Sequence, residues 1–244
     1  MENFVGRPTA AVEIAVQDAV GARVAREAGA DRVELCGALA ATGGLTPSLG
    51  TIETVVAVGL PVHVLVRPRT GGFQHDADEL ALMEVDIRHA VRAGASGVVV
   101  GVLDAHGVVD RDAVARLRDA ADGREVTFHR ALDVVTDRLA ALHVLADLGI
   151  TRVLTSGGAA RTILGIDELA AMVREGTGVQ IMAGGGLRAQ DVAPLLVVGV
   201  DAVHLSASVE RDDRGPAGPG GGAGGAYLVT DPDRVREVVR AAHP

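Results

Sequence analysis

One repeating unit constrains the fold of this chain more than any other feature. It consists of an amphipathic helix, a glycine, one or two small residues and a valine-rich strand, as in AREAGADRVEL, AVRAGASGVVV, ADLGITRVLT and VVGVDAVHL. Glycine suits the position just after a helix because it adopts positive φ without strain. Further glycines extend the pattern along the chain, so helices are expected to end roughly every 20 to 35 residues, the period of a βα unit.

The pattern predicts eight strands that alternate with eight helices. The strands are expected at 12–16, 32–36, 61–67, 97–102, 124–129, 152–156, 180–183 and 202–206. The helices are expected at 18–28, 47–58, 76–93, 110–121, 136–148, 161–175, 189–198 and 231–242. This alternation favours an α/β fold, a single parallel (β/α)₈ TIM barrel over residues 1–244. An open doubly wound sheet is the alternative, because local patterns do not reveal closure.

The composition indicates in which cellular compartment the protein is located and which classes of molecule it can bind. The net charge of −9 argues against nucleic acid and anionic membranes as partners. No apolar run reaches the length of a membrane span, and the first residues do not resemble a signal peptide. The single cysteine predicts a cytoplasmic protein without an internal disulfide. All 23 basic residues are arginine, which excludes a lysine Schiff base. The sequence is compatible with a homodimer.

Polar residues concentrate where the predicted strands end, in VELC, VRPR, TFHR, LTSGG, MAGGG and VHLS. A TIM barrel builds its site from these ends. Because strand side chains alternate between faces, parity predicts which of them point into the barrel. The predicted interior residues are Glu13, Glu34, Cys36, His63, Arg67, Arg69, Thr127, His129, Met182, Gly184, His204 and Ser206. Since buried charges need partners, Glu13 and Glu34 are expected to meet Arg67 or Arg69; a purely structural charge network is the alternative.

Proton transfer and anion binding are the chemistry that these residues suggest. His129 and Glu34 form the best acid–base pair, with Arg67 as a third catalytic candidate. The glycine-rich strand ends suggest backbone amides for an anion, although glycines also simply permit tight turns. Asp133 is expected to cap a helix or brace Arg130. The predicted anion-binding residues are Arg69, Arg130, Ser156, Gly157, Gly158, Gly184, Gly185, Gly186, His204 and Ser206.

Two further features of the sequence lie outside this proton-transfer and anion-binding chemistry. Cys36 is the one thiol available as a Cu(I) ligand, and a small buried thiol is the alternative. The segment 210–226 is rich in glycine and proline and is predicted to be a flexible loop before the last helix, either a solvated linker or a lid.

The chain resembles the CutC family of copper homeostasis proteins. The resemblance runs from Val12 to Ser208 through AGADRVELC, GGLTPSLG, RPRTGGF, GVVVGVL, VTFHRALD, RVLTSGG, IMAGGG and VHLSAS. It implies a TIM barrel, a cytoplasmic location and an association with copper. It also implies a shared pocket of Glu34, Arg67, Arg69, His129, Arg130, Ser156 and the glycine loops. Family copper proposals lean on cysteines, and only Cys36 is present here.

Three hypotheses follow. The first is a CutC-like protein that binds Cu(I) weakly through Cys36. The second is a metal-independent isomerase, lyase or hydrolase that acts on a small phosphorylated or carboxylated metabolite by acid–base chemistry. The third is a non-catalytic binding barrel. The pocket is rich in arginine and glycine and poor in soft ligands, which favours a small anionic metabolite over a copper ion.

Overall fold

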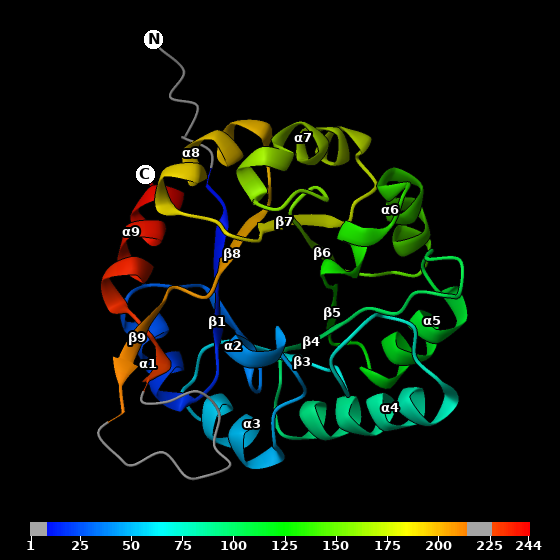
Figure 1. Ribbon diagram of the computed structural model, residues 1–244, viewed down its shortest axis with the longest axis horizontal. Helices are drawn as coiled ribbons and strands as arrows, with labels where there is room; N and C mark the ends of the chain where they lie inside the picture. The colour runs from blue at the N-terminus through cyan, green and yellow to red at the C-terminus, as the bar shows by residue number, and fades with distance from the viewer. Residues whose placement is uncertain (1–8, 214–225) are drawn as a thin grey trace.

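The computed structural model describes residues 9–213 and 226–244 and shows a closed barrel of parallel strands (Figure 1). The barrel strands are β1 Ala11–Val16, β2 Arg32–Leu35, β3 Val62–Leu65, β4 Gly97–Val100, β5 Glu125–Phe128, β6 Arg152–Thr155, β7 Gln180–Gly184 and β8 Ala202–Leu205. The helices around them are α1 Ala19–Glu27, α2 Leu39–Thr42, α3 Leu49–Val56, α4 Ala77–Arg92, α5 Arg111–Ala120, α6 Arg138–Asp147, α7 Ile166–Glu175, α8 Ala189–Val198 and α9 Pro232–Ala242. Two short 3₁₀ helices are η1 Arg130–Val134 and η2 Thr162–Gly165.

Closure of the ring confirms the TIM barrel and excludes the open sheet. Strand β1 pairs in parallel with β2 on one side and with β8 on the other, so that Glu13 lies in register with Arg32 and with His204. All eight predicted barrel strands and eight predicted long helices are present. The carboxyl ends of the strands therefore meet at one mouth, which is where the sequence places its polar residues.

The main hydrophobic core lies between the strands and the surrounding helices. Val12, Ile14 and Val16 of β1 point toward this layer and are fully buried, as the alternation of side chains predicts. Because aromatic residues are few, this core consists mainly of valine, leucine, isoleucine and alanine. No helix of the described residues is long and apolar enough to cross a membrane.

Side-chain caps fix where several helices begin. Asp76 and Asp110 accept hydrogen bonds from backbone amides in the first turns of α4 and α5. Asp137 accepts from the Ala140 amide and caps the start of α6 in the same way.

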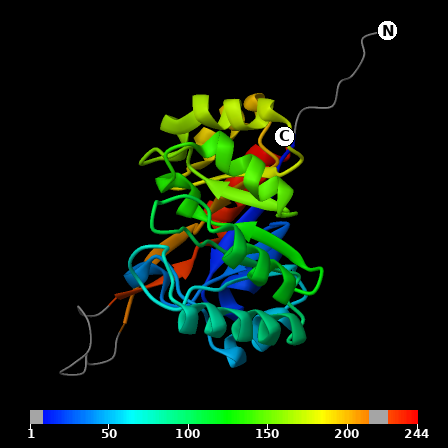
Figure 2. The same cartoon turned by 90° about the vertical axis from the view of Figure 1, so that its right-hand side faces the viewer.

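The structure corrects the predicted loop 210–226 at both of its ends. Strands β9 Ser208–Asp212 and β10 Ala226–Thr230 pair as an antiparallel ribbon next to α1 (Figure 1). Residues 214–225 lie outside the described residues. In the turned view, the ribbon projects from the left-hand side of the barrel, where α2 also lies (Figure 2). The ribbon therefore stands at the mouth.

Candidate functional site

A buried carboxylate, Glu13, organises the charges inside the barrel. Arg32 Nε donates to Glu13 at 2.6 Å, and the Nδ1 atoms of His204 and His63 lie 2.8 and 3.3 Å from its two oxygens. Burial alone would raise the pKa of Glu13, but the contacts with His204, His63 and Arg32 hold it well below its usual range. Glu13 is therefore ionised and balances the positive charge around it.

His63 continues this network toward the other end of the barrel. Its Nε2 lies 3.1 Å from Glu125, which also receives a hydrogen bond from Arg152 at 3.1 Å. Burial disfavours the charged imidazole, yet the bonds to Glu125 and Glu13 raise the pKa of His63. The predicted partners of Glu13 are thus wrong: it meets Arg32, which has the same strand parity as Glu34, and not Arg67 or Arg69.

Nearer the mouth, Glu34 lies between a histidine and a thiol. Its Oε2 is 3.7 Å from His204 Nε2 and accepts a hydrogen bond from Cys36 Sγ at 3.2 Å. Burial raises the pKa of Glu34, partly offset by the charge on His204. Burial would lower the pKa of His204, but Glu34 and Glu13 raise it. These two groups can exchange protons with a ligand at the mouth.

The mouth itself encloses a cavity of about 500 Å³, which is in the usual range for small-molecule sites. Glu34 and His204 reach it from below, and the residues that complete its wall come from several strand ends. The full lining is Glu34, Leu39, Thr42, Gly43, Leu65, Arg67, Phe73, His129, Arg130, Leu154, Gly185, Gly186, His204, Leu205 and Ser206.

Arg67 is fixed on the wall of this cavity. Its terminal nitrogens donate to the backbone carbonyls of Thr42 and Gly44, at 3.2 Å each, and of Gly71 at 2.7 Å. The guanidinium also lies over the Phe73 ring, 5.6 Å from its centre. Its Nε is buried and has no hydrogen-bond partner among the described residues. A buried N–H without an acceptor is costly, so a ligand oxygen that gave it an acceptor would be stabilised there.

His129 has a neutral ring at the mouth. Its Nδ1 accepts from the Ala131 amide at 3.1 Å, which leaves the proton of the neutral ring on Nε2. Burial, followed by the charge on Arg67, lowers the pKa of His129 to about 3. Glu34, the predicted partner of His129, contacts His204 and Cys36, and both Glu34 and His129 line the mouth. His129 is equipped to donate a hydrogen bond rather than to accept a proton at neutral pH.

The low pKa of His129 gives a stability prediction. The unfolded chain binds a proton at this residue below pH 6.5 and the folded chain does not until about pH 3, so stability is lost as the pH falls from 6.5. His129→Asn keeps an acceptor for Ala131 and removes this titration. We expect the stability deficit of the variant to shrink by about 2 kcal/mol between pH 7 and pH 5 in urea unfolding. A deficit that does not change with pH would contradict the neutral ring.

Asp133 fills the first glycine loop. Its carboxylate accepts from Ser156 N at 2.9 Å, from Gly158 N at 3.2 Å and from the Thr155 hydroxyl at 2.5 Å. It also braces Arg130 Nε at 2.7 Å, as predicted. The loop 156–158 is thus an anion site already occupied by the protein's own carboxylate, and the Gly157 amide donates to Thr155. This corrects the prediction that Ser156, Gly157 and Gly158 bind an external anion.

The remaining predicted anion-binding residues divide into two groups. Arg69 is half-exposed and pairs with Glu79 and the Gln74 carbonyl, away from the cavity wall, because the chain turns outward after Arg67. Gly184 is the last residue of strand β7 and is not among the residues that line the cavity. Five others do line the mouth, as the sequence predicts: Arg130, Gly185, Gly186, His204 and Ser206.

Sequence reasoning missed several contributors. Arg32 shares the inward parity of Glu34, so the same rule could have identified it. Phe73 contacts both Arg67 and the His129 ring, at 5.0 Å between ring centres, but it follows an irregular segment with no periodic signal. The apolar wall residues Leu39, Leu65 and Leu154 had no signal of their own.

The sequence model of the CutC family matches residues 10–209 of this chain. The chain belongs to the CutC family. A family protein CutC of Xanthomonas campestris pv. campestris strain 8004 is 42% identical over 234 residues, covering 94% of this chain and 97% of the relative. One from Agrobacterium fabrum is 43% identical over 199 residues, covering 81% and 79% of the two chains. The resemblance expected from the sequence is confirmed.

Solved structures agree with this CutC assignment. The structure assigned as the copper homeostasis protein CutC of Streptococcus agalactiae is 32% identical, with a TM-score of 0.75, over 81% of this chain and 98% of that one. A protein of Burkholderia cenocepacia assigned as a lyase or mutase is 25% identical, with a TM-score of 0.59, over 82% and 77%.

Among the described residues of this CutC chain, the sulfur-containing side chains are poorly placed for Cu(I). Cys36 is fully buried, and burial together with the Glu34 charge raises the pKa of its thiol well above the usual range. The other sulfur in the barrel, Met182 Sδ, lies 3.2 Å from a nitrogen of the cationic Arg32. Within the described ranges, no group of three or more His, Cys, Asp or Glu residues could hold a metal ion. Thiolate and thioether ligands suited to Cu(I) are therefore not assembled.

Proposed function

We propose that the mouth cavity binds a small carboxylate or phosphate compound and that Glu34 and His204 move a proton on it. The buried Nε of Arg67, which lacks an acceptor, is the observation that carries this proposal. An anionic oxygen would satisfy it with a charge-assisted hydrogen bond. Arg130 adds positive charge on the same wall, and the neutral His129 ring adds an Nε2–H donor.

The arrangement supports acid–base chemistry. Glu34 has a raised pKa and His204 has a raised pKa, so the two groups can share a proton across 3.7 Å. Glu13 holds His204 from the other side and keeps its ring oriented. The reaction classes that need only these groups are isomerisation, lyase cleavage or hydrolysis. The related Burkholderia cenocepacia barrel is assigned as a lyase or mutase, which is consistent with such chemistry.

Loss of Arg67 should weaken anion binding. Sulfate is the probe, because it does not titrate in the working range. We expect Arg67→Ala to weaken sulfate binding by about 10- to 100-fold in isothermal titration, since a hydrogen bond to a charged group contributes about 1.5–3 kcal/mol. Arg69→Ala is the matched control: this neighbouring arginine pairs with Glu79 outside the cavity. Equal effects of the two substitutions, or no sulfate binding to the wild type, would contradict the proposal.

Direct Cu(I) binding through Cys36 is the second candidate function. The copper homeostasis role assigned to the Streptococcus agalactiae relative favours it. It requires the Cys36 thiol to lose its proton and its contact with Glu34. A Cu(I) titration against a competing chelator tests it: Cys36→Ser must abolish the affinity, and unchanged affinity would exclude Cys36 as the ligand. A cytoplasmic location, proposed from the lone cysteine, fits either function.

A further inference from the structure

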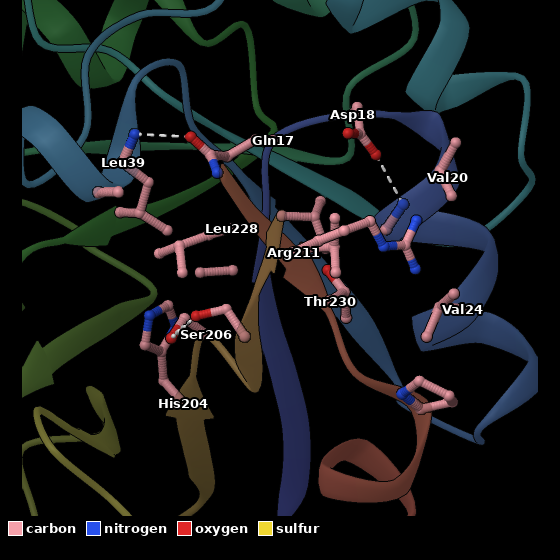
Figure 3. A pocket seen from close by; sticks show the side chains of 17 residues that line it. Gln17, Asp18, Val20, Val24, Leu39, His204, Ser206, Arg211, Leu228 and Thr230 are labelled. Atoms are coloured by element: carbon pink, nitrogen blue, oxygen red, sulfur yellow. Dashed lines mark hydrogen bonds between the residues drawn. The ribbon is translucent and has the colours of Figure 1, made fainter. Parts of the chain in front are cut away.

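A second cavity lies beside the mouth, between α1 and the β9–β10 ribbon (Figure 3). Its volume is about 480 Å³. Of its lining residues, the proposed chemistry uses only His204. Its lining is Ala15, Val16, Gln17, Asp18, Val20, Gly21, Val24, Leu39, Ala40, His204, Ser206, Ser208, Arg211, Leu228, Val229, Thr230 and Pro232.

This side cavity adjoins the mouth. Leu39, His204 and Ser206 line both. In Figure 3, His204 and Ser206 lie at one end of the side cavity, and Val20 and Val24 lie across it on α1. A ligand whose charged group contacts Arg67 can therefore extend past His204 without leaving the protein wall.

The walls of the side cavity are mainly aliphatic. Val20 and Val24 come from α1, Leu39 from α2 and Leu228 from β10. Val20 is 59% exposed, unlike the buried valines of the core. Aliphatic side chains from three separate elements around one hollow form a surface that gains free energy when an apolar group covers it.

Polar groups mark the edges of this surface. The Gln17 side-chain oxygen accepts from the Leu39 amide at 2.9 Å, which leaves its amide nitrogen on the cavity side (Figure 3). The Ser206 and Ser208 hydroxyls lie 3.2 Å apart at the junction with the mouth. Asp18 is used as the cap of α1, where it accepts from Gly21 N. Arg211 of β9 also lines the cavity, and in Figure 3 its side chain extends across it toward α1. The aliphatic residues form the rest of the wall.

We propose that the side cavity holds an apolar tail of the ligand whose anionic head occupies the mouth. This rests on the proposed function of the mouth and specifies its ligand class: an elongated carboxylate or phosphate with an aliphatic chain, rather than a compact dianion. The β9–β10 ribbon then acts as one wall of the binding site, through Leu228 and Thr230.

The test compares ligands that differ only in chain length. Ethyl phosphate and hexyl phosphate are titrated against the full chain, with acetate and hexanoate as the carboxylate arm. Each buried methylene is worth up to roughly a factor of four in affinity, so hexyl phosphate is expected to bind at least about tenfold more tightly than ethyl phosphate. Val20→Gln and Leu228→Gln should each reduce this ratio to below about three and leave ethyl phosphate affinity unchanged. Val197→Gln, on the exposed face of α8, is the matched control and should preserve the ratio.

The outcomes separate the two proposals. If ethyl phosphate binds and Arg67→Ala removes that binding, but hexyl phosphate is no tighter, the apolar tail is wrong and the anion site stands. A chain-length gain that survives both Val20→Gln and Leu228→Gln also overturns the tail proposal. If neither head group binds to the wild type, the anion site itself is wrong and the tail proposal falls with it.

Discussion

Glu13→Gln is expected to lower the free energy of unfolding by about 3 to 5 kcal/mol, the typical cost of removing one partner from a buried ion pair. Glutamine keeps the shape of the side chain but removes its charge. Arg32, His63 and His204 would then share a largely buried interior without the carboxylate that all three contact. Arg32 cannot shed its proton, so its charge is left uncompensated.

Urea unfolding at pH 6 measures this loss. Glu175→Gln is the control, because it removes a carboxylate from a surface pair with His143 and should change stability by less than about 1 kcal/mol. Histidine NMR titration gives an independent readout: the pKa of His204 should fall in Glu13→Gln, since Glu13 contributes to raising it. A stability loss as small as that of the control would show that Glu13 does not organise the interior.

Gly101→Ala is expected to cost about 3 kcal/mol and to weaken sulfate binding. A Cβ at position 101 would lie 2.2 Å from two atoms of the His129 ring, a distance that the buried ring cannot tolerate without moving. Overpacking of this kind typically costs about 1–3 kcal/mol. The displaced ring would move within the wall that it shares with Arg67 and Phe73. Unfolding in urea and sulfate titration check the two effects.

The control for this substitution is Gly50→Ala. Gly50 lies in α3 and a Cβ there meets nothing within 4 Å, so alanine should be neutral or stabilising by up to about 1 kcal/mol. If Gly101→Ala folds with wild-type stability and binds sulfate as the wild type does, then the placement of His129 against β4 does not define the mouth.

The barrel could be predicted from the sequence because its signals are local and repeated. A glycine follows each of the long helices from α1 and α3 through α8, an apolar strand follows each of these glycines, and the structure confirms the predicted strands and helices. The β9–β10 ribbon was missed because the glycine and proline content between its strands outweighed the short alternation in AYLVT. A pairing between two segments separated by such a stretch has no local signal.

The site could be predicted in part. Strand parity correctly placed Glu13, Glu34, His63 and His204 in one interior, since alternation is a property of each strand alone. It failed for Arg69, which lies beyond the end of β3, where the chain no longer alternates. It also could not show that Asp133 fills the loop 156–158, because that contact joins residues more than twenty positions apart.

A crystal structure of the protein with sulfate or ethyl phosphate tests the central claim most directly. The anion is expected at the mouth, with one oxygen within hydrogen-bonding distance of Arg67 Nε and the His129 and Arg130 side chains beside it. An anion bound only away from Arg67, with Nε still lacking an acceptor, would contradict the claim that the mouth of this barrel is built for an anionic ligand.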